Sequence, residues 1–268
     1  MLFKETLGRQ LYKKFLLDII KETCPPKKRC IYSDSYYLDN IILVLTELVS
    51  WKSLRNIHPQ KPHNHYKTIQ DKFLLWSNNK IFEKAYNKLI TEEIVPKCNS
   101  HTTLNLYIDS SDIHNNDGIK MVKTGKNKKK KVTKISYICD NNKTVYGVSF
   151  YEGNVSDVKT IIPSINPIIN KILYRRINLI GDKGYISKDR GNELRKSKVF
   201  LITPKRKNMH IKTTSFEKKK LKNRYIIEHC IRENKIFNRV SFRKDKLINT
   251  YKSFVYLALI IRFNRFNP

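Results

Sequence analysis

Residues 177–187, INLIGDKGYIS, form an apolar run that ends abruptly at Asp182 between two glycines. Short apolar runs bounded by glycine are typical of buried strands, so this segment is expected to carry a carboxylate to the rim of a sheet. A single aspartate at a strand end is also a common turn former or helix cap. Two further acids favour a functional role, since Asp109 ends an earlier strand pattern and Glu228 lies on a later helix pattern.

The charge of the chain indicates a polyanionic partner. Its 268 residues include 54 Lys and Arg against 23 Asp and Glu, a formal charge of +31, and 40% of them are hydrophobic. That apolar content is enough for a folded core. A basic excess spread along the whole chain repels itself unless a polyanion neutralises it. Nucleic acid is therefore the expected partner, with an anionic membrane surface as the alternative.

Export and membrane insertion are not indicated. The longest apolar runs, residues 41–45 and 255–261, are much shorter than a bilayer span, and residues 1–15 lack the apolar core of a signal peptide. The five cysteines are odd in number and irregularly spaced, as expected for reduced thiols inside a cell. A zinc site is a minor alternative, because its candidate ligands match no common finger or ribbon and a polar linker explains them as well. These ligands are Cys24, Cys30, His58, His63 and His65.

Residues 1–98 are predicted to form a mainly helical domain. Apolar positions recur at helical spacing in residues 41–57, IILVLTELVSWKSLRNI, and again in residues 66–90 after the polar loop HPQKPHNH. Helices joined by a short turn suit a DNA-binding module, although helical bundles with other roles have the same pattern. Both interpretations stay open at this point.

Residues 99–268 are predicted to form an α/β domain, because strand and helix patterns alternate there. The strand LNLYID ends at Asp109, two strands joined by a turn at residues 140–142 follow, and after a helix come the strand of Asp182, another helix and the strand VFLIT. Strand, helix and strand in this order imply parallel pairing with a right-handed crossover. A final amphipathic segment, residues 251–266, is expected to pack on the sheet.

Residues 115–131 contain two glycines and the lysine run KNKKKK, so this segment is expected to be an exposed connection. Such a run is usually a solvated loop. Because it follows Asp109 in a chain of such high charge, a loop that contacts phosphates is an equal alternative. The basic residues predicted to contact DNA are Arg224, Lys235, Lys128, Lys129, Lys130 and Lys183.

Three carboxylates delivered by two strands and a helix suit the binding of two divalent ions at a phosphodiester. Hard oxygen ligands select magnesium or manganese, one ion activating the attacking water or hydroxyl and the other stabilising the leaving oxygen. The helix pattern puts Arg224 and Lys235 on the same broad face as Glu228, where they can orient a DNA strand through its phosphates. An exposed ion pair between Arg224 and Glu228 is the simpler interpretation of that spacing.

The chain resembles the DDE transposases of bacterial insertion sequences, specifically the group-five branch with its close relative, group four. YIDSSDI and LIGDKGYIS resemble the two aspartate motifs, and YGVSFYEGNVSD, VFLITPKRKN and residues 243–265 resemble flanking segments, so the resemblance covers roughly residues 40–265. On its last catalytic helix this branch has Tyr, Arg, Glu and Lys at fixed spacing. In this chain Leu221, Arg224, Glu228 and Lys235 stand at the same spacing, so only the tyrosine is replaced, by Leu221.

This resemblance implies a ribonuclease H-like core, a mixed five-stranded sheet flanked by helices. Asp109, Asp182 and Glu228 would be its catalytic and metal-binding triad, with two Mg²⁺ ions per site and Mn²⁺ as a substitute. The short spacing between the second aspartate and the glutamate leaves no room for the large β insertion of some relatives.

Other polar residues near the triad are given lesser roles. Asp112 and Asp117 are rival first carboxylates, but both lie past the expected strand end, in a loop less able to hold geometry. His114 and His229 are interpreted as polar neighbours, because a two-metal site needs no histidine base. Asp157 is interpreted as a helix cap rather than a ligand.

The resemblance further implies a transposase that binds the terminal inverted repeats of its element through the N-terminal helices. It would cut at the element ends and join the freed 3′ hydroxyl to target DNA, as a homodimer or higher multimer on paired ends. The expected location is the cytoplasm, at the nucleoid in a bacterium, or the nucleus or a viral factory with a eukaryotic or viral host. The alternatives are an inactive or domesticated DNA-binding descendant, a nuclease or resolvase of the same fold, and a basic membrane-surface protein.

Overall fold

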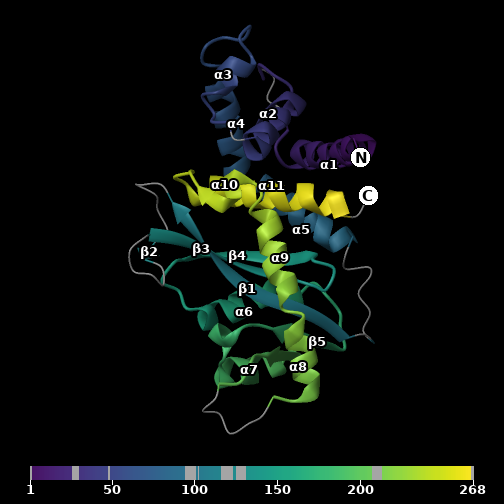
Figure 1. The fold of residues 1–268 in the computed structure, drawn as a ribbon. Helices are drawn as coiled ribbons and strands as arrows, with labels where there is room; N and C mark the ends of the chain where they lie inside the picture. Colours follow the sequence, from purple (N-terminus) through teal and green to yellow (C-terminus); the bar gives the residue numbers. More distant parts are fainter. Residues whose placement is uncertain are drawn as a thin grey trace. The chain divides into compact units, whose positions relative to one another are not determined.

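The computed structural model describes residues 2–25, 30–47, 49–93, 101, 103–115, 123–124, 131–206 and 213–266. The chain forms two compact units (Figure 1). The helical unit contains the described residues up to Leu89 and from Asn234 onward, and the sheet unit lies between Ile90 and Glu233. This division differs from the expected 1–98 and 99–268, because the described residues after Glu233 belong with the N-terminal helices.

The sheet unit has a mixed sheet with the strand order β4-β3-β1-β5-β6. β1 pairs antiparallel with β3, β3 pairs antiparallel with β4, and β1, β5 and β6 are parallel neighbours. When these five strands are numbered in chain order, leaving out the two-residue strand β2, the order across the sheet is 3-2-1-4-5. This order confirms the expected ribonuclease H-like fold class. The strands are β1 (Thr103–Asn115), β2 (Lys123–Thr124), β3 (Lys131–Cys139), β4 (Val145–Glu152), β5 (Arg176–Ile180) and β6 (Val199–Ile202). The helices are α6 (Asp157–Ile169), η2 (Lys183–Tyr185), α7 (Lys188–Arg195), α8 (Ser215–Lys222) and α9 (Tyr225–Asn234).

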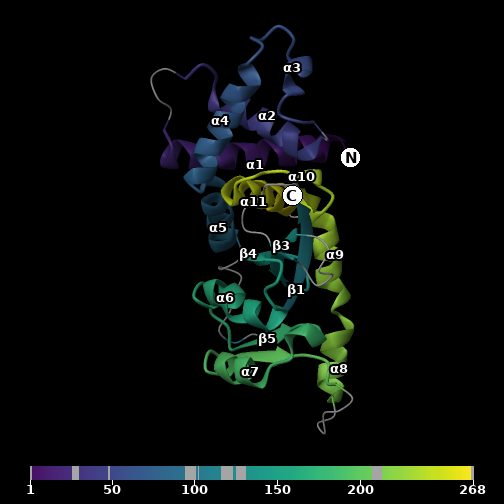
Figure 2. The ribbon, with the colours of Figure 1, turned by 90° about the vertical axis from the view of Figure 1, so that its left-hand side faces the viewer.

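The pairing of β1 determines where its acidic side chain lies. Pairing with β5 stops at the Tyr107–Ile180 pair, whereas pairing with β3 continues almost to the end of β1. Asp109 therefore lies just past the point where the parallel neighbour ends. Side chains alternate along a strand, so Asp109 and Ser110 point to opposite faces. Figure 2 shows α9 along one face of this sheet and α6 on the other.

The predicted turn between β3 and β4 is confirmed. One carboxylate oxygen of Asp140, Oδ1, accepts hydrogen bonds from the backbone N–H groups of Asn142 at 2.8 Å and Thr144 at 2.9 Å. Lys143 takes a positive φ of 62° inside this turn. Asp140 thus folds the chain back on itself through local hydrogen bonds, as its residue type favours.

The helical unit is held together by a core of aromatic and aliphatic side chains. Trp76 is fully buried, and its ring packs edge-on against Tyr37 and Phe82. Phe254 joins this core from α11, with its ring centroid 4.5 Å from that of Phe73. The helices are α1 (Leu2–Thr23), α2 (Asp34–Thr46), α3 (Leu54–Ile57), α4 (His65–Asn78), α5 (Ile81–Glu93), α10 (Asn238–Ser241) and α11 (Ile248–Phe266).

The sequence interpretation put residues 251–266 on the sheet, whereas α11 packs against α1, α4 and α10. Every residue from 253 to 262 is buried. A helix that is buried all round has no narrow apolar stripe, so its sequence pattern does not identify the element it contacts.

The histidines named as possible zinc ligands have other neighbours. His58 Nε2 lies 2.8 Å from the side-chain oxygen of Asn40, His63 contacts Arg55, and His65 Nδ1 lies 3.2 Å from a backbone carbonyl. None of the helices among the described residues has the length and hydrophobicity of a membrane-spanning segment.

Candidate active site

Asp109 is a partly buried carboxylate with a perturbed pKa. Its Oδ1 accepts a hydrogen bond of 2.8 Å from the backbone N–H of Ser110. Burial is the largest cause of a rise in its pKa to about 6. Repulsion by the carboxylates of Asp182 and Asp157 adds to this rise, while the Ser110 N–H and the Arg224 guanidinium oppose it. Strongly perturbed acids with charged neighbours are common at functional sites.

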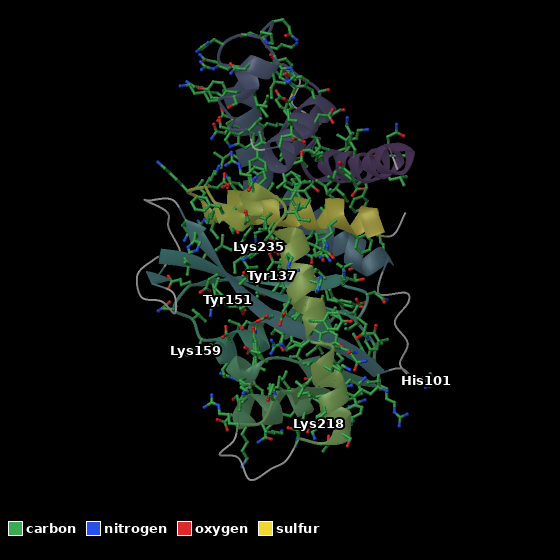
Figure 3. The ribbon with its side chains drawn as sticks, viewed as in Figure 1. His101, Tyr137, Tyr151, Lys159, Lys218 and Lys235 are labelled. Carbon is green, nitrogen blue, oxygen red and sulfur yellow. The ribbon has the colours of Figure 1, made fainter. Side chains whose placement is uncertain are left out.

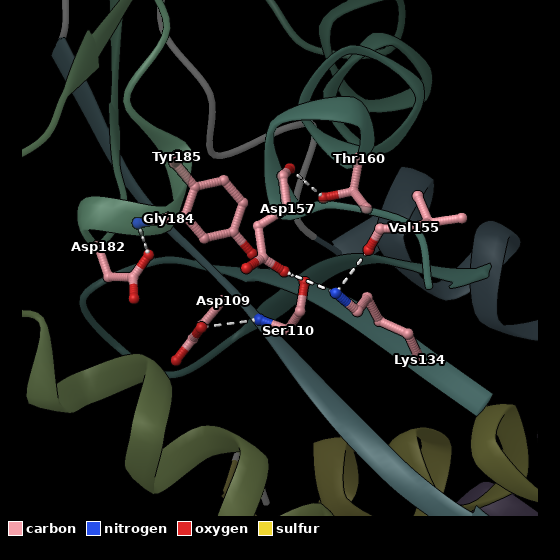
Figure 4. A network of polar contacts seen from close by, with 9 residues as sticks. All are labelled: Asp109, Ser110, Lys134, Val155, Asp157, Thr160, Asp182, Gly184 and Tyr185. Atoms are coloured by element: carbon pink, nitrogen blue, oxygen red, sulfur yellow. Dashed lines mark hydrogen bonds and ion pairs between the residues drawn. The ribbon is translucent and has the colours of Figure 1, made fainter. Parts of the chain in front are cut away.

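Asp182 is both a strand-end acid and a cap. It follows β5 by two residues and is the N-cap of η2, where its Oδ1 accepts a hydrogen bond of 2.7 Å from Gly184 N–H. The two interpretations of this aspartate from the sequence are therefore compatible. One oxygen holds the turn, and Asp182 lies near enough to Asp109 to raise its pKa (Figure 4).

Two glycines allow this turn to close tightly. A Cβ on Gly181 would lie only 2.9 to 3.1 Å from atoms of the Tyr185 side chain, which is fully buried. A Cβ on Gly184 would lie 2.8 Å from Asp182 Oδ1 and 2.9 Å from Asp157 Oδ2. Real Cβ atoms essentially never come within 3.0 Å of another heavy atom in this way. The glycines that flank Asp182 are thus required by close approach of neighbouring side chains.

Gly184→Ala is expected to destabilise the protein by about 1–3 kcal/mol, the usual cost of overpacking, because Asp182 Oδ1 is held by a hydrogen bond and Asp157 is held through its other oxygen by Lys134. Gly191→Ala is the matched control. Gly191 lies inside α7, and no described atom comes within 4 Å of a Cβ placed on it, so alanine should stabilise the helix by roughly 0.5–1 kcal/mol. Urea unfolding of the two variants measures the difference, and equal effects would contradict the close approach at Gly184.

Glu228 lies in the first turn of α9 and forms an ion pair with Arg224. Arg224 Nη2 donates to Glu228 Oε1 at 2.9 Å, and the two side chains are 29% and 48% exposed. The ion pair that this spacing suggested is therefore confirmed, but the predicted helix is broken, because Arg224 lies in the turn between α8 and α9. The same guanidinium lowers the pKa of Asp109, so Arg224 lies close to both acids. Its Nε is buried and has no hydrogen-bond partner among the residues that the structure describes.

The carboxylates at this site are the type of ligand that a hard divalent cation prefers, but they are not arranged around a single position. The charge of Asp182 makes it harder to ionise Asp109, and a bound cation would relieve this repulsion. Among the described residues, however, no three His, Cys, Asp or Glu side chains are grouped so that they could hold a metal ion. Glu228 would have to leave Arg224 to complete a three-acid site.

The structure describes two of the other basic residues predicted to contact DNA. Lys183 is exposed in η2, directly after Asp182, and Lys235 follows α9 by one residue. The lysine run at 128–130 lies outside the described residues. Further exposed lysines of the sheet unit include Lys159 on α6 and Lys218 on α8 (Figure 3).

The expected end of the first strand at Asp109 was wrong, because β1 continues to Asn115. Asp112 and His114 are consequently strand residues, paired with β3, and not loop residues. The strand persists because β3 supplies hydrogen-bond partners after β5 has ended. Asp117 lies outside the described part of the chain. His229 is exposed on α9, with its ring centroid 5.9 Å from that of Tyr225.

Asp157 was expected to be a helix cap, but the N-cap of α6 is Ser156 and Asp157 is the first helical residue. Its Oδ1 instead accepts a hydrogen bond of 2.9 Å from Lys134 Nζ in a buried ion pair. No sequence signal indicated this partner, because Lys134 occurs in a strand pattern 23 residues earlier. The carboxylate nonetheless lies near Asp109 and Gly184, inside the candidate site.

Comparison with known proteins identifies the family. A family model described as Transposase DDE domain matches residues 107–246, more than half of the chain, and this range includes all three predicted triad acids. No curated protein sequence gives a significant match. A solved structure of the piggyBac transposase in a synaptic complex with hairpin DNA aligns over 96% of this chain and 65% of that chain, with a TM-score of 0.46 and 12% identity. The family match confirms the resemblance at the level of the DDE domain, and the chain belongs to the Transposase DDE domain family.

Proposed function

We propose that this chain is a DNA transposase of the insertion-sequence type, of the group-five branch or its close relative. It nicks DNA at the ends of its element and joins the freed 3′ hydroxyl to target DNA. The observation that carries this proposal is the placement of Asp109 and Asp182. The two acids lie together where the parallel pairing of β1 and β5 ends, and burial together with repulsion from Asp182 raises the pKa of Asp109 to about 6.

Asp109, Asp182 and Glu228 are the residues that would hold Mg²⁺. Divalent ions bound there would polarise the scissile phosphodiester and activate the attacking water or hydroxyl. For Glu228 to take part, its carboxylate must exchange Arg224 for the metal, a rearrangement of one exposed ion pair that costs little, about 1 kcal/mol or less. Arg224 is then free to contact a phosphate of the strand being cut.

The remaining basic residues have a role in binding. Lys183 lies beside Asp182 and is exposed, so it is available to a phosphate near the reacting bond. Lys235 and the lysine run at 128–130 are proposed as further backbone contacts, and the N-terminal helices as the part that binds the inverted repeats. A charge of +31 favours such contacts, and their strength should fall with salt. Two copies acting on paired ends would bring both termini of the element together.

Purified protein with Mg²⁺ is expected to nick duplex DNA that carries the inverted repeats flanking its gene. Nicks should map to the repeat boundary, and joined products should appear when a supercoiled plasmid is added as target. EDTA should abolish both, and duplex without the repeats should be cut much less. Cutting without joining would instead favour a nuclease. The absence of any metal-dependent cutting would refute the proposal that the chain is an enzyme.

An inactive DNA-binding descendant is the second candidate, and one observation favours it. Glu228 is held by Arg224, and the described acids do not form a three-donor metal group. This alternative predicts tight binding to the inverted repeats and no cutting with either Mg²⁺ or Mn²⁺. The same assay therefore separates the two functions.

A further inference from the structure

A buried ion pair lies next to the turn of Asp182 in the candidate site. Lys134 on β3 has a side chain that is only 2% exposed, and its Nζ donates to Asp157 Oδ1 at 2.9 Å and to the carbonyl of Val155 at 2.7 Å. Asp157, at the start of α6, has a side chain that is 9% exposed. Figure 4 shows the ammonium group between these two acceptors.

The second oxygen of the Asp157 carboxylate, Oδ2, lies against the turn that contains Asp182. A Cβ placed on Gly184 would meet Asp157 Oδ2 at 2.9 Å and Asp182 Oδ1 at 2.8 Å, so both oxygens lie against the same glycine. The N–H of this glycine donates to Asp182 Oδ1 at 2.7 Å. A continuous line of contacts therefore runs from Lys134 through Asp157 and Gly184 to the carboxylate of Asp182.

A second connection joins the same turn to β1. The hydroxyl groups of Tyr185 and Ser110 lie 2.8 Å apart, and the Tyr185 ring is fully buried. Ser110 also donates its backbone N–H to Asp109. The turn after β5 is thus held on one side by Asp157 and on the other by β1, so the positions of Asp109 and Asp182 depend on each other.

Stability alone does not explain an ion pair at this place. Apolar residues of similar volume are often as stable as a buried pair, because desolvation cancels much of the attraction between the charges. A carboxylate here also adds to the repulsion felt by Asp109. Lys134 compensates for this charge. The ion pair therefore keeps a carboxylate oxygen of Asp157 fixed against Gly184.

We propose that Lys134 and Asp157 are positioning residues for the reaction, which set the turn from Asp182 to Tyr185 and thereby the carboxylate of Asp182. Neither residue is proposed to touch metal or DNA. The catalytic consequence depends on the proposed function, whereas the positioning itself does not. Mutation of a residue that orients a metal ligand typically lowers metal affinity or activity about 10–100-fold.

The positioning can be measured without activity through the amide of Gly184. Its 2.7 Å hydrogen bond to a carboxylate should give a proton resonance far downfield. Lys183–Gly184 is the only Lys-Gly pair in the chain, so labelling with ¹³C-carbonyl lysine and ¹⁵N-glycine yields a single peak in an HNCO spectrum. In Lys134→Met/Asp157→Ala this peak is expected to move upfield and broaden.

A matched pair in the helical unit provides the control. Lys72 and Asp34 also form an ion pair at 2.9 Å, with side chains only 10% and 12% exposed, and Asp34 is likewise the first helical residue after a serine N-cap. Lys72→Met/Asp34→Ala should lower the melting temperature about as much as the first double variant. It should leave the Gly184 peak in place, because its effect is on stability alone.

Two further measurements connect the positioning to the site. Mn²⁺ should broaden the Gly184 peak of the wild type at lower concentration than that of Lys134→Met/Asp157→Ala. The Mg²⁺ concentration for half-maximal nicking should rise about 10–100-fold in this variant and stay unchanged in the control. If the variant does not fold, Lys134→Arg, which keeps the charge but changes its reach, must move the Gly184 peak.

An unmoved Gly184 peak in a folded variant would overturn the positioning role, even if the wild type cuts DNA. A shifted peak in a wild-type protein that neither binds Mn²⁺ nor cuts would leave the positioning intact and refute the proposed function instead.

Discussion

Asp182→Asn is expected to lower magnesium-dependent nicking by about 10³-fold or more, because a ligand charge worth several kcal/mol to the transition state is lost. The fold should be retained. Asparagine is as good an N-cap as aspartate, and its side-chain oxygen can still accept the hydrogen bond from Gly184. Rates of nicking on end-bearing duplex, together with a melting curve for each protein, measure this separation of chemistry from stability.

Asp189→Asn is the matched control for this variant. Asp189 lies in the exposed first turn of α7, seven residues further along the chain, and its loss should change nicking little. Glu228→Gln should lower nicking as strongly as the change at Asp182 if both acids hold the same ions. Wild-type cutting by Asp182→Asn would show that the triad is assigned to the wrong residues.

Asp109→Asn is expected to stabilise the metal-free protein at pH 8 while abolishing cleavage. Burial raises the pKa of Asp109 to about 6, above its value of about 4 in an unfolded chain, so the folded state is penalised when this acid is ionised. As pH falls through 6, the folded protein takes up a proton before the unfolded chain does, and the wild type recovers stability. From pH 8 to pH 5 this recovery is about 1.4 kcal/mol.

Urea unfolding in EDTA at both pH values tests this linkage. The difference in unfolding free energy between Asp109→Asn and the wild type should be larger at pH 8 than at pH 5 by about 1.4 kcal/mol. The rate of cleavage should instead fall as pH is lowered, since only the ionised acid can hold a cation. A pH-independent difference would mean that Asp109 has an ordinary pKa.

Local sequence was sufficient to predict the most important turn of the site. The apolar run before Asp182, its flanking glycines and the cap are all contained within a few residues, so their physics does not depend on distant partners. The strand of Asp109 and the Asp140 turn were predictable for the same reason. The spacing of Arg224 and Glu228 was also local, because a helix brings residues four apart into contact.

Features that depend on distant pairing were not predictable from one sequence. The continuation of β1 past Asp109 requires a partner strand, and the polar letters SSDIHN give no sign of it. Lys134 looks like a surface residue in a strand pattern until β4 and α6 cover it. Asp157 likewise stands where a helix cap is expected, at the start of a helix pattern. Only the folded chain shows that its carboxylate turns toward Lys134.

The order of the two units along the chain has a consequence for biosynthesis. Phe254 and its neighbours on α11 complete the aromatic core around Phe73, yet they are translated after the whole sheet unit. Domains commonly fold as they emerge from the ribosome, N-terminal first. Here the sheet unit can close during translation, whereas α1 to α4 must wait for α11 with apolar surface exposed. On a stalled ribosome the helical unit should therefore be the part that chaperones hold.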